Sequence, residues 1–278
     1  MSVSLLDQAP SILGIEIKSP KEIGAMRTVC RLAAETLLAV GERIRPGMTT
    51  LDIDRIVHEH TLGQGARPAP LHYKGFPKSV CTSVNEIVCH GIPDGYVLRN
   101  GDIVNVDVTH VYDGFHGDTS ATFYVGTPTV DARHVVEVAR RALDVGVEQV
   151  RDGARLGDIG GAIQEYVEAQ GCSVVRDFVG HGIGRKFHDA PQVKHYGNRG
   201  TGERLRTGMT FTIEPMVNLG GWEVKVDPND KWTVRTADGT LSAQFEHTML
   251  VTRGGFEVLT ARDRPLRNSE NIAALFVA

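Results

Sequence analysis

Four carboxylates and one histidine of this 278-residue chain are residue types that commonly bind metal ions. They are Asp107, Asp118, His181, Glu214 and Glu246. Alternation of side chains along the expected strands places each acid on a polar strand face, while neighbours such as Val106 and Ile213 face the other way. A single acid on such a face usually only meets water. An aspartate is nevertheless unfavourable inside a strand, so Asp107 and Asp118 require a further explanation.

The settings of Asp107 and Glu214 indicate an internal duplication. The segments Leu98–Gly101 and Leu205–Gly208 precede the two acids, and each acid lies nine residues after its leucine (107 − 98 and 214 − 205). Upstream, Gly41 and Gly146 begin two further segments that match each other. These glycines are 105 residues apart (146 − 41), and the two leucines are 107 residues apart (205 − 98). A period this long is typical of a duplicated fold unit. We therefore expect two similar halves, at about residues 19–127 and 128–260.

If the two halves close face to face, the four acids converge, and carboxylates at short range raise one another's pKa values. Two divalent cations would supply four positive charges against the four carboxylates. Together with His181 as a nitrogen ligand, this oxygen and nitrogen set suits Mn, Fe, Co or Zn better than Ca or Mg. Such a pair of ions lowers the pKa of a bound water and polarises a carbonyl. The pattern thus predicts hydrolysis of an acyl or phosphoryl bond.

Three histidines lie in glycine-rich or apolar settings near these acids in the sequence. His90 and His181 share a His-Gly-Ile core, and His188 follows Phe187. Glycines beside a histidine permit close approach of the backbone to a site. A lone histidine would more often be a core or surface residue, but three in such settings favour a functional role. We interpret His90 and His188 as donors to the substrate.

The elements that must position these residues can be predicted from caps and periodicity. Ser19-Pro20-Lys21-Glu22 is a helix start, and Thr49–Asp52 opens a second helix that ends near Gly63. The other half offers helices at about 131–150 and 156–170. Short β-branched runs predict strands at Val80–Ser83, Ile103–Val108, Ser120–Val125, Thr210–Ile213 and Met249–Thr252. Helix pairs followed by strands predict an α+β fold, with residues 1–18 as an N-terminal arm.

Composition narrows the class of protein. The formal charge is −4, and the sequence has no cluster of Lys and Arg residues that could bind nucleic acid, so a direct nucleic-acid function is not expected. The start of the chain lacks the pattern of a signal peptide, and no stretch approaches the roughly 20 apolar residues that span a bilayer. We expect a soluble cytoplasmic protein that does not bind a membrane. The four cysteines form no CxxC pair and are expected to be reduced.

Five segments taken together resemble the type I methionine aminopeptidases. In the order of that family they are Cys89–Pro93, Gly114–Thr119, Gly180–Gly184, Thr212–Met216 and Gln244–Thr248. The similarity runs from about residue 20 to residue 260. It implies the pita-bread fold, in which two pseudo-symmetric α+β halves with a curved antiparallel sheet and outer helices form a single catalytic domain, here residues 1–278. It also implies removal of the initiator methionine from nascent polypeptides whose second residue is small.

The resemblance implies a role for each candidate residue. Asp118 and Glu246 would bridge two divalent metal ions (Co, Mn, Fe, Zn or Ni), Asp107 would hold one ion, and His181 with Glu214 would hold the other. Glu214 would also carry a proton from water to the leaving amine. His188 would stabilise the tetrahedral intermediate, and His90 would contact the scissile amide, so the catalytic set is His90, His188 and Glu214. The methionine pocket would be lined by Tyr73, Phe76, Cys81, Phe187 and Trp222.

Two alternatives remain open at this point. A proline-directed aminopeptidase or dipeptidase of the creatinase type shares the fold, although such relatives usually carry a further N-terminal domain for which this chain lacks room. A non-catalytic binding protein of the same fold would have lost the metal ligands, and here all five are present. For the leading interpretation, the partners are nascent polypeptide N-termini and the ribosome, and the enzyme is expected to be a monomer.

Overall fold

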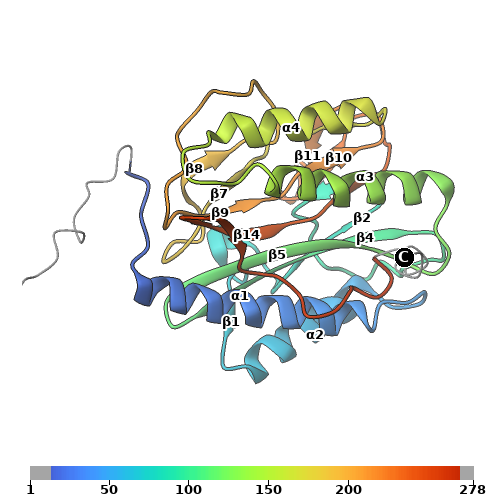
Figure 1. Ribbon diagram of the computed structural model, residues 1–278. Helices are drawn as coiled ribbons and strands as arrows, with labels where there is room; N and C mark the ends of the chain where they lie inside the picture. The colour runs from blue at the N-terminus through green and yellow to red at the C-terminus, as the bar shows by residue number, and fades with distance from the viewer. Residues whose placement is uncertain (1–13, 270–278) are drawn as a thin grey trace, which may run out of the picture.

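The computed structural model describes residues 14–269, in which two pairs of helices enclose a set of antiparallel strands (Figure 1). Helices α1 (Pro20–Gly41) and α2 (Thr50–Gly63) lie on one side of the strands, and α3 (Val130–Val147) and α4 (Leu156–Ala169) lie on the other. Each half of the chain contributes one helix pair. The strands between them therefore have both outer faces covered.

The helix starts lie where the caps predict them. Ser19 accepts a hydrogen bond from the Glu22 N–H at 3.4 Å, and the Glu22 side chain accepts one from the Ser19 N–H at 3.0 Å. Thr49 and Asp52 form the same reciprocal box at the start of α2. These bonds satisfy backbone donors that the first helical turn leaves free. Helices α3 and α4 confirm the other two predictions to within three residues.

Two larger sheets carry the acids. The first joins β1 (Arg67–Pro68), β4 (Ile103–Tyr112) and β2 (Cys81–Val84), with β5 (Phe115–Tyr124) paired to β4. The second has the order β15 (Gly255–Val258), β14 (His247–Thr252), β9 (Thr210–Ile213), β7 (Gly180–Gly182) and β8 (Asp189–Val193). Strand β5 begins five residues before the predicted Ser120, because Asp113 and Gly114 form a tight positive-φ turn that lets β4 and β5 pair along their whole length.

Two three-stranded sheets complete the structure. One joins β13 (Ser242–Gln244), β10 (Met216–Asn218) and β6 (Ser173–Val174). The other joins β11 (Val224–Val226), β12 (Val234–Thr236) and β3 (Ile87–Cys89), and a short 3-10 turn, η2 (Tyr73–Gly75), precedes β2. The register of β12 on β3 pairs Val234 with Cys89. This pairing brings a segment of the second half beside the residues that precede His90.

Buried hydrogen bonds join the β4–β5 hairpin to strands of the second half. The Thr119 hydroxyl donates to the Glu246 carbonyl at 2.9 Å, and the Thr248 hydroxyl donates to the Asp118 carbonyl at 2.8 Å. The Glu246 N–H also donates to the Ser120 carbonyl at 3.1 Å. One hydrophobic cluster runs through both halves and includes Phe123 and Phe211. The backbone of Asp118 is thereby held against that of Glu246.

Several other predictions can be compared with the described residues. All four cysteines are free and buried, as predicted. Within residues 14–269, no helix is long and apolar enough to cross a membrane.

Of the predicted arm, residues 1–13 lie outside the described range. Ile15 is buried, and the Lys18 N–H donates to the Gly208 carbonyl at 2.9 Å, so this part of the arm packs on the second half.

Helix α1 crosses β5 at Gly117, one residue before Asp118. A Cβ atom there would lie 2.7 Å from the Cys30 nitrogen and 2.8 Å from the Val29 carbonyl carbon. Gly117→Ala should therefore force α1 off the strand and lower the free energy of unfolding by about 1–3 kcal/mol. The matched control is Gly24→Ala, in the same helix, where an added Cβ meets nothing within 4 Å. That change should raise the free energy of unfolding by about 0.5–1 kcal/mol. Equal effects of both changes in urea unfolding would contradict this packing.

Candidate metal centre and substrate pocket

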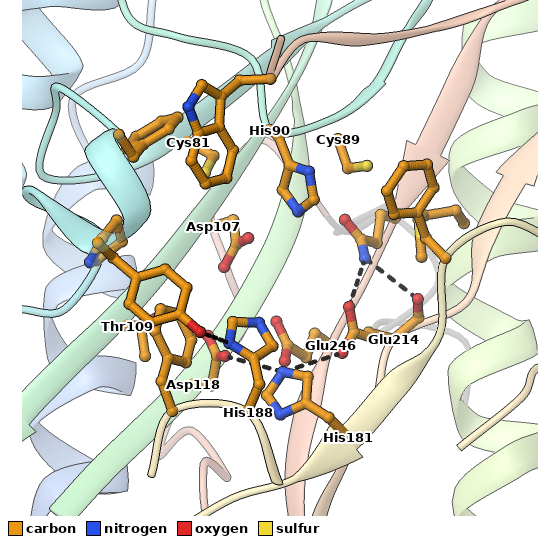
Figure 2. Close-up of a pocket in the computed structure, with 18 of the residues that line it drawn as sticks. Cys81, Cys89, His90, Asp107, Thr109, Asp118, His181, His188, Glu214 and Glu246 are labelled. Carbon is orange, nitrogen blue, oxygen red and sulfur yellow. Dashed lines mark hydrogen bonds and ion pairs between the residues drawn. The ribbon is translucent and has the colours of Figure 1, made fainter. Parts of the chain in front are cut away.

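A cavity of about 370 Å³ lies between the two halves, and both halves line it. Figure 2 shows that the labelled acids and histidines project into this common space. Eleven of the twelve predicted site residues line it, and these are Tyr73, Phe76, Cys81, His90, Asp107, Asp118, His181, Phe187, His188, Glu214 and Glu246. The structure thus brings together residues that are up to 173 positions apart in the chain (246 − 73).

Trp222 is the predicted pocket residue that the structure does not bring to the cavity. Its ring lies beneath the Arg176 guanidinium, 4.8 Å from the centroid. Trp232 lines the cavity instead, with ring centroids 5.2 Å from Phe76 and 6.0 Å from His90. The reason is the pairing of β12 with β3, which holds the residues just before Val234 beside His90. The tryptophan that lines the cavity is therefore Trp232 and not Trp222.

The five side chains predicted as metal ligands meet at one end of the cavity. Oxygens of Asp107, Asp118 and Glu246 lie within 4.8 Å of one another. The His181 Nε2 atom lies 3.8 Å from Asp118 Oδ2 and 3.7 Å from Glu214 Oε1. Asp107 Oδ1 is buried and has no hydrogen-bond partner within residues 14–269. A buried oxygen without a partner is costly, and a cation would satisfy it, so these residues fit the metal ions that the sequence predicts.

The electrostatics of the cluster point the same way. Burial raises the pKa of Asp107 to about 6 and that of Glu214 to about 8. Burial and the neighbouring carboxylates raise the pKa values of Asp118 and Glu246 well above their ordinary range. Without metal, the protein thus disfavours the state in which all four carboxylates are ionised. Bound cations would favour that state again. Burial lowers the pKa of His181 to about 4, which keeps the ring neutral, as a metal ligand must be.

Neighbouring side chains orient the ligand groups. His181 Nδ1 lies 3.1 Å from the Gly182 carbonyl and must donate to it, so the lone pair of Nε2 faces the acids. The Thr212 hydroxyl accepts from the His181 N–H at 2.9 Å and donates to Glu214 Oε1 at 2.6 Å. Thr109 donates to Asp118 Oδ1 at 2.7 Å. Each of these ligand side chains is therefore held by at least one defined hydrogen bond.

Sequence reasoning missed further residues that hold Glu214. The Gln244 amide donates to the Glu214 carbonyl at 3.2 Å and to Glu214 Oε2 at 3.3 Å. The Glu214 N–H donates to Nε2 of His195, a completely buried histidine whose pKa burial lowers to about 3. Strand alternation could have found Gln244 and Thr109, since each lies two residues from a predicted ligand on the same strand face. Nothing near His195 in the sequence connects it with Glu214.

The two remaining histidines lie among aromatic rings. His90 has a left-handed backbone conformation (φ 56°), and a Cβ on the following Gly91 would lie 2.1 Å from the Thr82 carbonyl oxygen. Only glycine permits this close crossing of β2, which aims His90 into the cavity. His188 lies at the mouth of the cavity, where its ring centroid is 4.2 Å from those of both Phe187 and His181. Both rings thus face the same space as the acids.

Comparisons with known proteins agree with this geometry. The family model described as "Metallopeptidase family M24" matches residues 24–253. Methionine aminopeptidase A of Synechocystis sp. is 55% identical over 88% of this chain and 97% of its own length. The methionine aminopeptidase of Escherichia coli (strain K12) is 51% identical over 90% of this chain and 95% of its own.

Solved structures show the same relationship. The crystal structure of methionine aminopeptidase from Rickettsia prowazekii has a TM-score of 0.88 and 50% identity, and the match covers 89% of this chain and all of that one. The prolidase from Pyrococcus horikoshii has a TM-score of 0.70 at 23% identity, over 90% of this chain and 65% of that one, and shares the fold alone. The predicted pita-bread fold is confirmed by these matches.

The raised carboxylate pKa values predict how the stability of the metal-free protein depends on pH. Glu214 titrates near 8 in the folded state and near 4.5 when unfolded, so its contribution to stability is complete below pH 4.5 and is lost as the pH rises to 8. Buried histidines such as His195 have lowered pKa values and act in the opposite direction, but only up to their ordinary value of 6.5. Between pH 6.5 and 8 the carboxylates therefore decide the slope.

We expect the melting temperature of EDTA-treated protein to fall from pH 6.5 to pH 8, because the folded state loses protons that the unfolded state has already lost. An excess of Mn²⁺ should abolish the fall, since bound cations stabilise the ionised cluster. Glu214→Gln should make the fall shallower in the metal-free protein, since it removes one titrating group. A melting temperature that is constant or rises over this range would contradict the raised pKa values of the buried acids.

Proposed function

Because the chain belongs to metallopeptidase family M24, we propose that this cavity is the active site of a metal-dependent methionyl aminopeptidase. The enzyme removes the initiator methionine from nascent polypeptides whose second residue is small. The relatives named methionine aminopeptidase match about nine-tenths of the chain at 50–55% identity. The observation that carries the proposal is the position of the acid cluster at the end of a cavity whose other walls are mainly apolar and aromatic. Such a cavity can hold one side chain while its backbone lies over the acids.

The enzyme uses divalent metal, as its family does. Asp107, Asp118, His181, Glu214 and Glu246 would hold the two ions. The oxygen and nitrogen donors suit Co, Mn, Fe, Zn or Ni. When bound, the metal supplies a water of lowered pKa and polarises the scissile carbonyl.

The chain's own residues provide the proton transfers and the orientation of the substrate. Glu214 accepts the proton of the attacking water and passes it to the leaving amine. The hydrogen bonds from Thr212 and Gln244 hold that carboxylate in one orientation, which reduces the reorganisation needed for each transfer. His188 donates to the oxygen of the scissile carbonyl as it gains negative charge, and His90 contacts the scissile amide.

Five side chains would form the methionine pocket, and these are Tyr73, Phe76, Cys81, Phe187 and Trp232. A methionine side chain is flexible and polarizable, and its sulfur makes favourable contacts with aromatic rings. Phe76 is buried against the Trp232 ring, and burial keeps the Cys81 thiol protonated by raising its pKa well above the ordinary value. The pocket is therefore apolar and uncharged, as a thioether side chain requires.

The remaining parts of the proposal follow from the reaction. The substrate is the N-terminus of a polypeptide that is still being made, so we infer that the enzyme works in the cytoplasm and associates with the ribosome. All five ligand groups come from one chain, so a monomer is sufficient. We propose that residues 1–278 form one catalytic domain with repeats at about 19–127 and 128–260. The prolidase-like alternative rests on likenesses of at most 23% identity, which show the fold alone.

A two-peptide assay tests the reaction. Manganese-loaded enzyme should release methionine from Met-Ala-Ser about 100-fold faster than from Met-Lys-Ser, because a large second residue disturbs the position of the scissile bond. Free methionine measured by chromatography gives both rates, and Leu-Pro serves as the substrate of a proline-directed enzyme. No methionine from Met-Ala-Ser, or faster cleavage of Leu-Pro, would reject the proposal.

A tryptophan pair tests the pocket. Trp232→Ala removes a ring that packs on Phe76, so KM for Met-Ala-Ser should rise about 10-fold through lost contact with the methionine side chain. Trp222→Ala is the matched control, because its ring lies under Arg176 outside the cavity, and KM should stay within about twofold of the wild type. A larger effect of Trp222→Ala than of Trp232→Ala would place the methionine pocket elsewhere.

A further inference from the structure

We infer that the Tyr73 hydroxyl is a positioning group for the reaction: by donating to Nδ1 of His188, it fixes the tautomer of that ring that carries its proton on Nε2. The hydroxyl oxygen lies 3.0 Å from His188 Nδ1. Figure 2 shows this bond, with the second ring nitrogen of His188 turned toward the space between His90 and the acids. The role in the reaction rests on the proposed function, whereas the tautomer can be measured independently of it.

The direction of the bond decides what His188 can do. A neutral imidazole has one N–H and one lone pair, and whatever bonds to one nitrogen sets the state of the other. With the proton on Nε2, the ring can donate to a carbonyl oxygen that gains negative charge. With the proton on Nδ1, the lone pair of Nε2 would repel that oxygen. The function proposed for His188 therefore requires Nδ1 to accept a hydrogen bond from a neighbouring donor.

The phenol is suited to be the donor in this pair. Its O–H is more acidic than the N–H of a neutral imidazole, so the bond from oxygen to nitrogen is the stronger of the two directions. Within residues 14–269, no second side-chain hydrogen bond is found for the Tyr73 hydroxyl, so its proton is available to Nδ1. The hydroxyl thus does a task that ring packing alone does not explain, since a phenylalanine would line the methionine pocket equally well.

The backbone around Tyr73 holds it at this position at an energetic cost. His72 and Lys74, on either side, both have left-handed conformations (φ 66° and 49°), and Gly75 follows at φ 89°. Such conformations are unfavourable for a residue with a side chain, because its Cβ crowds the following carbonyl oxygen. Backbone bonds keep the turn closed, with the His72 N–H on the Phe76 carbonyl at 2.8 Å and the Tyr73 N–H on the Pro70 carbonyl at 2.9 Å.

Ring contacts restrain the pair from the other side. The Tyr73 ring lies 5.0 Å from Phe187 and 5.3 Å from His188, nearly parallel to the latter (25°). Tyr73 comes from the first half and His188 from the second, so the bond spans the mouth of the cavity. Two strained residues and two ring contacts therefore hold the Tyr73 ring, which carries the hydroxyl, and backbone strain of this kind often occurs at functional sites.

The first test removes only the hydroxyl. Tyr73→Phe should lower kcat for Met-Ala-Ser at least about 10-fold and change KM less than about twofold, because the ring still lines the pocket. Tyr112→Phe is the matched control, because Tyr112 ends β4 and does not line the cavity, so both constants should stay unchanged. An unchanged kcat in Tyr73→Phe, or a rise in KM without a fall in kcat, would overturn the inference.

A double-mutant cycle separates positioning from general damage. His188→Gln keeps an N–H donor near the position of Nε2 but has no tautomer to fix. Adding Tyr73→Phe to His188→Gln should therefore change kcat less than about twofold. A second loss as large as that in the wild-type background would show that the Tyr73 hydroxyl acts by another route, and would overturn the inference.

Nitrogen NMR of the zinc-loaded enzyme gives a readout without turnover. Histidine labelled with ¹⁵N, with the His188 signals identified by their loss in His188→Gln, should show a protonated Nε2 and an unprotonated Nδ1 at pH 8. In Tyr73→Phe the two signals should move toward each other as the tautomers mix. A proton on Nδ1 in the wild type, or no change in Tyr73→Phe, would contradict the assignment. If the wild type releases no methionine, the proposed function fails while the tautomer is still measured.

Discussion

Four carboxylates share one buried site, where burial raises the pKa of each acid and neighbouring carboxylates raise three of them further, and the fold must hold the acids together against this cost. Asp107 and Asp118 come from the β4–β5 hairpin, and Glu214 and Glu246 come from the other half. Hydrogen bonds between the backbones of Asp118 and Glu246 and the threonines at 119 and 248 hold these acids together against their charge. Folding therefore prepares a site that is unfavourable by itself and that divalent metal makes favourable.

The neighbours of the ligands extend this arrangement from charge to chemistry. Glu214 has its backbone N–H bonded to His195 and its side chain bonded to Thr212 and Gln244, so its position and orientation are set before substrate binds. His188 is set in the same way by Tyr73 from across the cavity. In the proposed reaction, Glu214 must be oriented to accept and release a proton, and His188 must keep one tautomer, with both groups near the same carbonyl. The supporting hydrogen bonds, which come from both halves, are therefore as much a part of the site as the ligands.

The parts of the molecule that local rules govern were predictable from the sequence. The capping residues predicted where α1 and α2 begin. Strand alternation predicted the polar strand faces of both acids, and in the structure Asp107 lies in β4 while Glu214 follows directly after β9. The resemblance of five motifs to one family then supplied the ligand set. The tryptophan of the pocket was not predictable in this way, because the pairing of Val234 with Cys89 decides that Trp232 and not Trp222 reaches His90. His195 was missed for the same physical reason, since its hydrogen bond to the Glu214 N–H exists only in the folded chain.

The most direct test of this account is the position of the metal ions in the folded protein. A crystal structure of the manganese-loaded enzyme, with anomalous scattering recorded near the manganese edge, locates each ion independently of the protein model. The account predicts two anomalous peaks within the cluster, each contacting acids of both halves, with Asp118 and Glu246 touching both ions. Manganese bound by only one half, or a cluster whose four carboxylates contact no ion at saturating manganese, would contradict it.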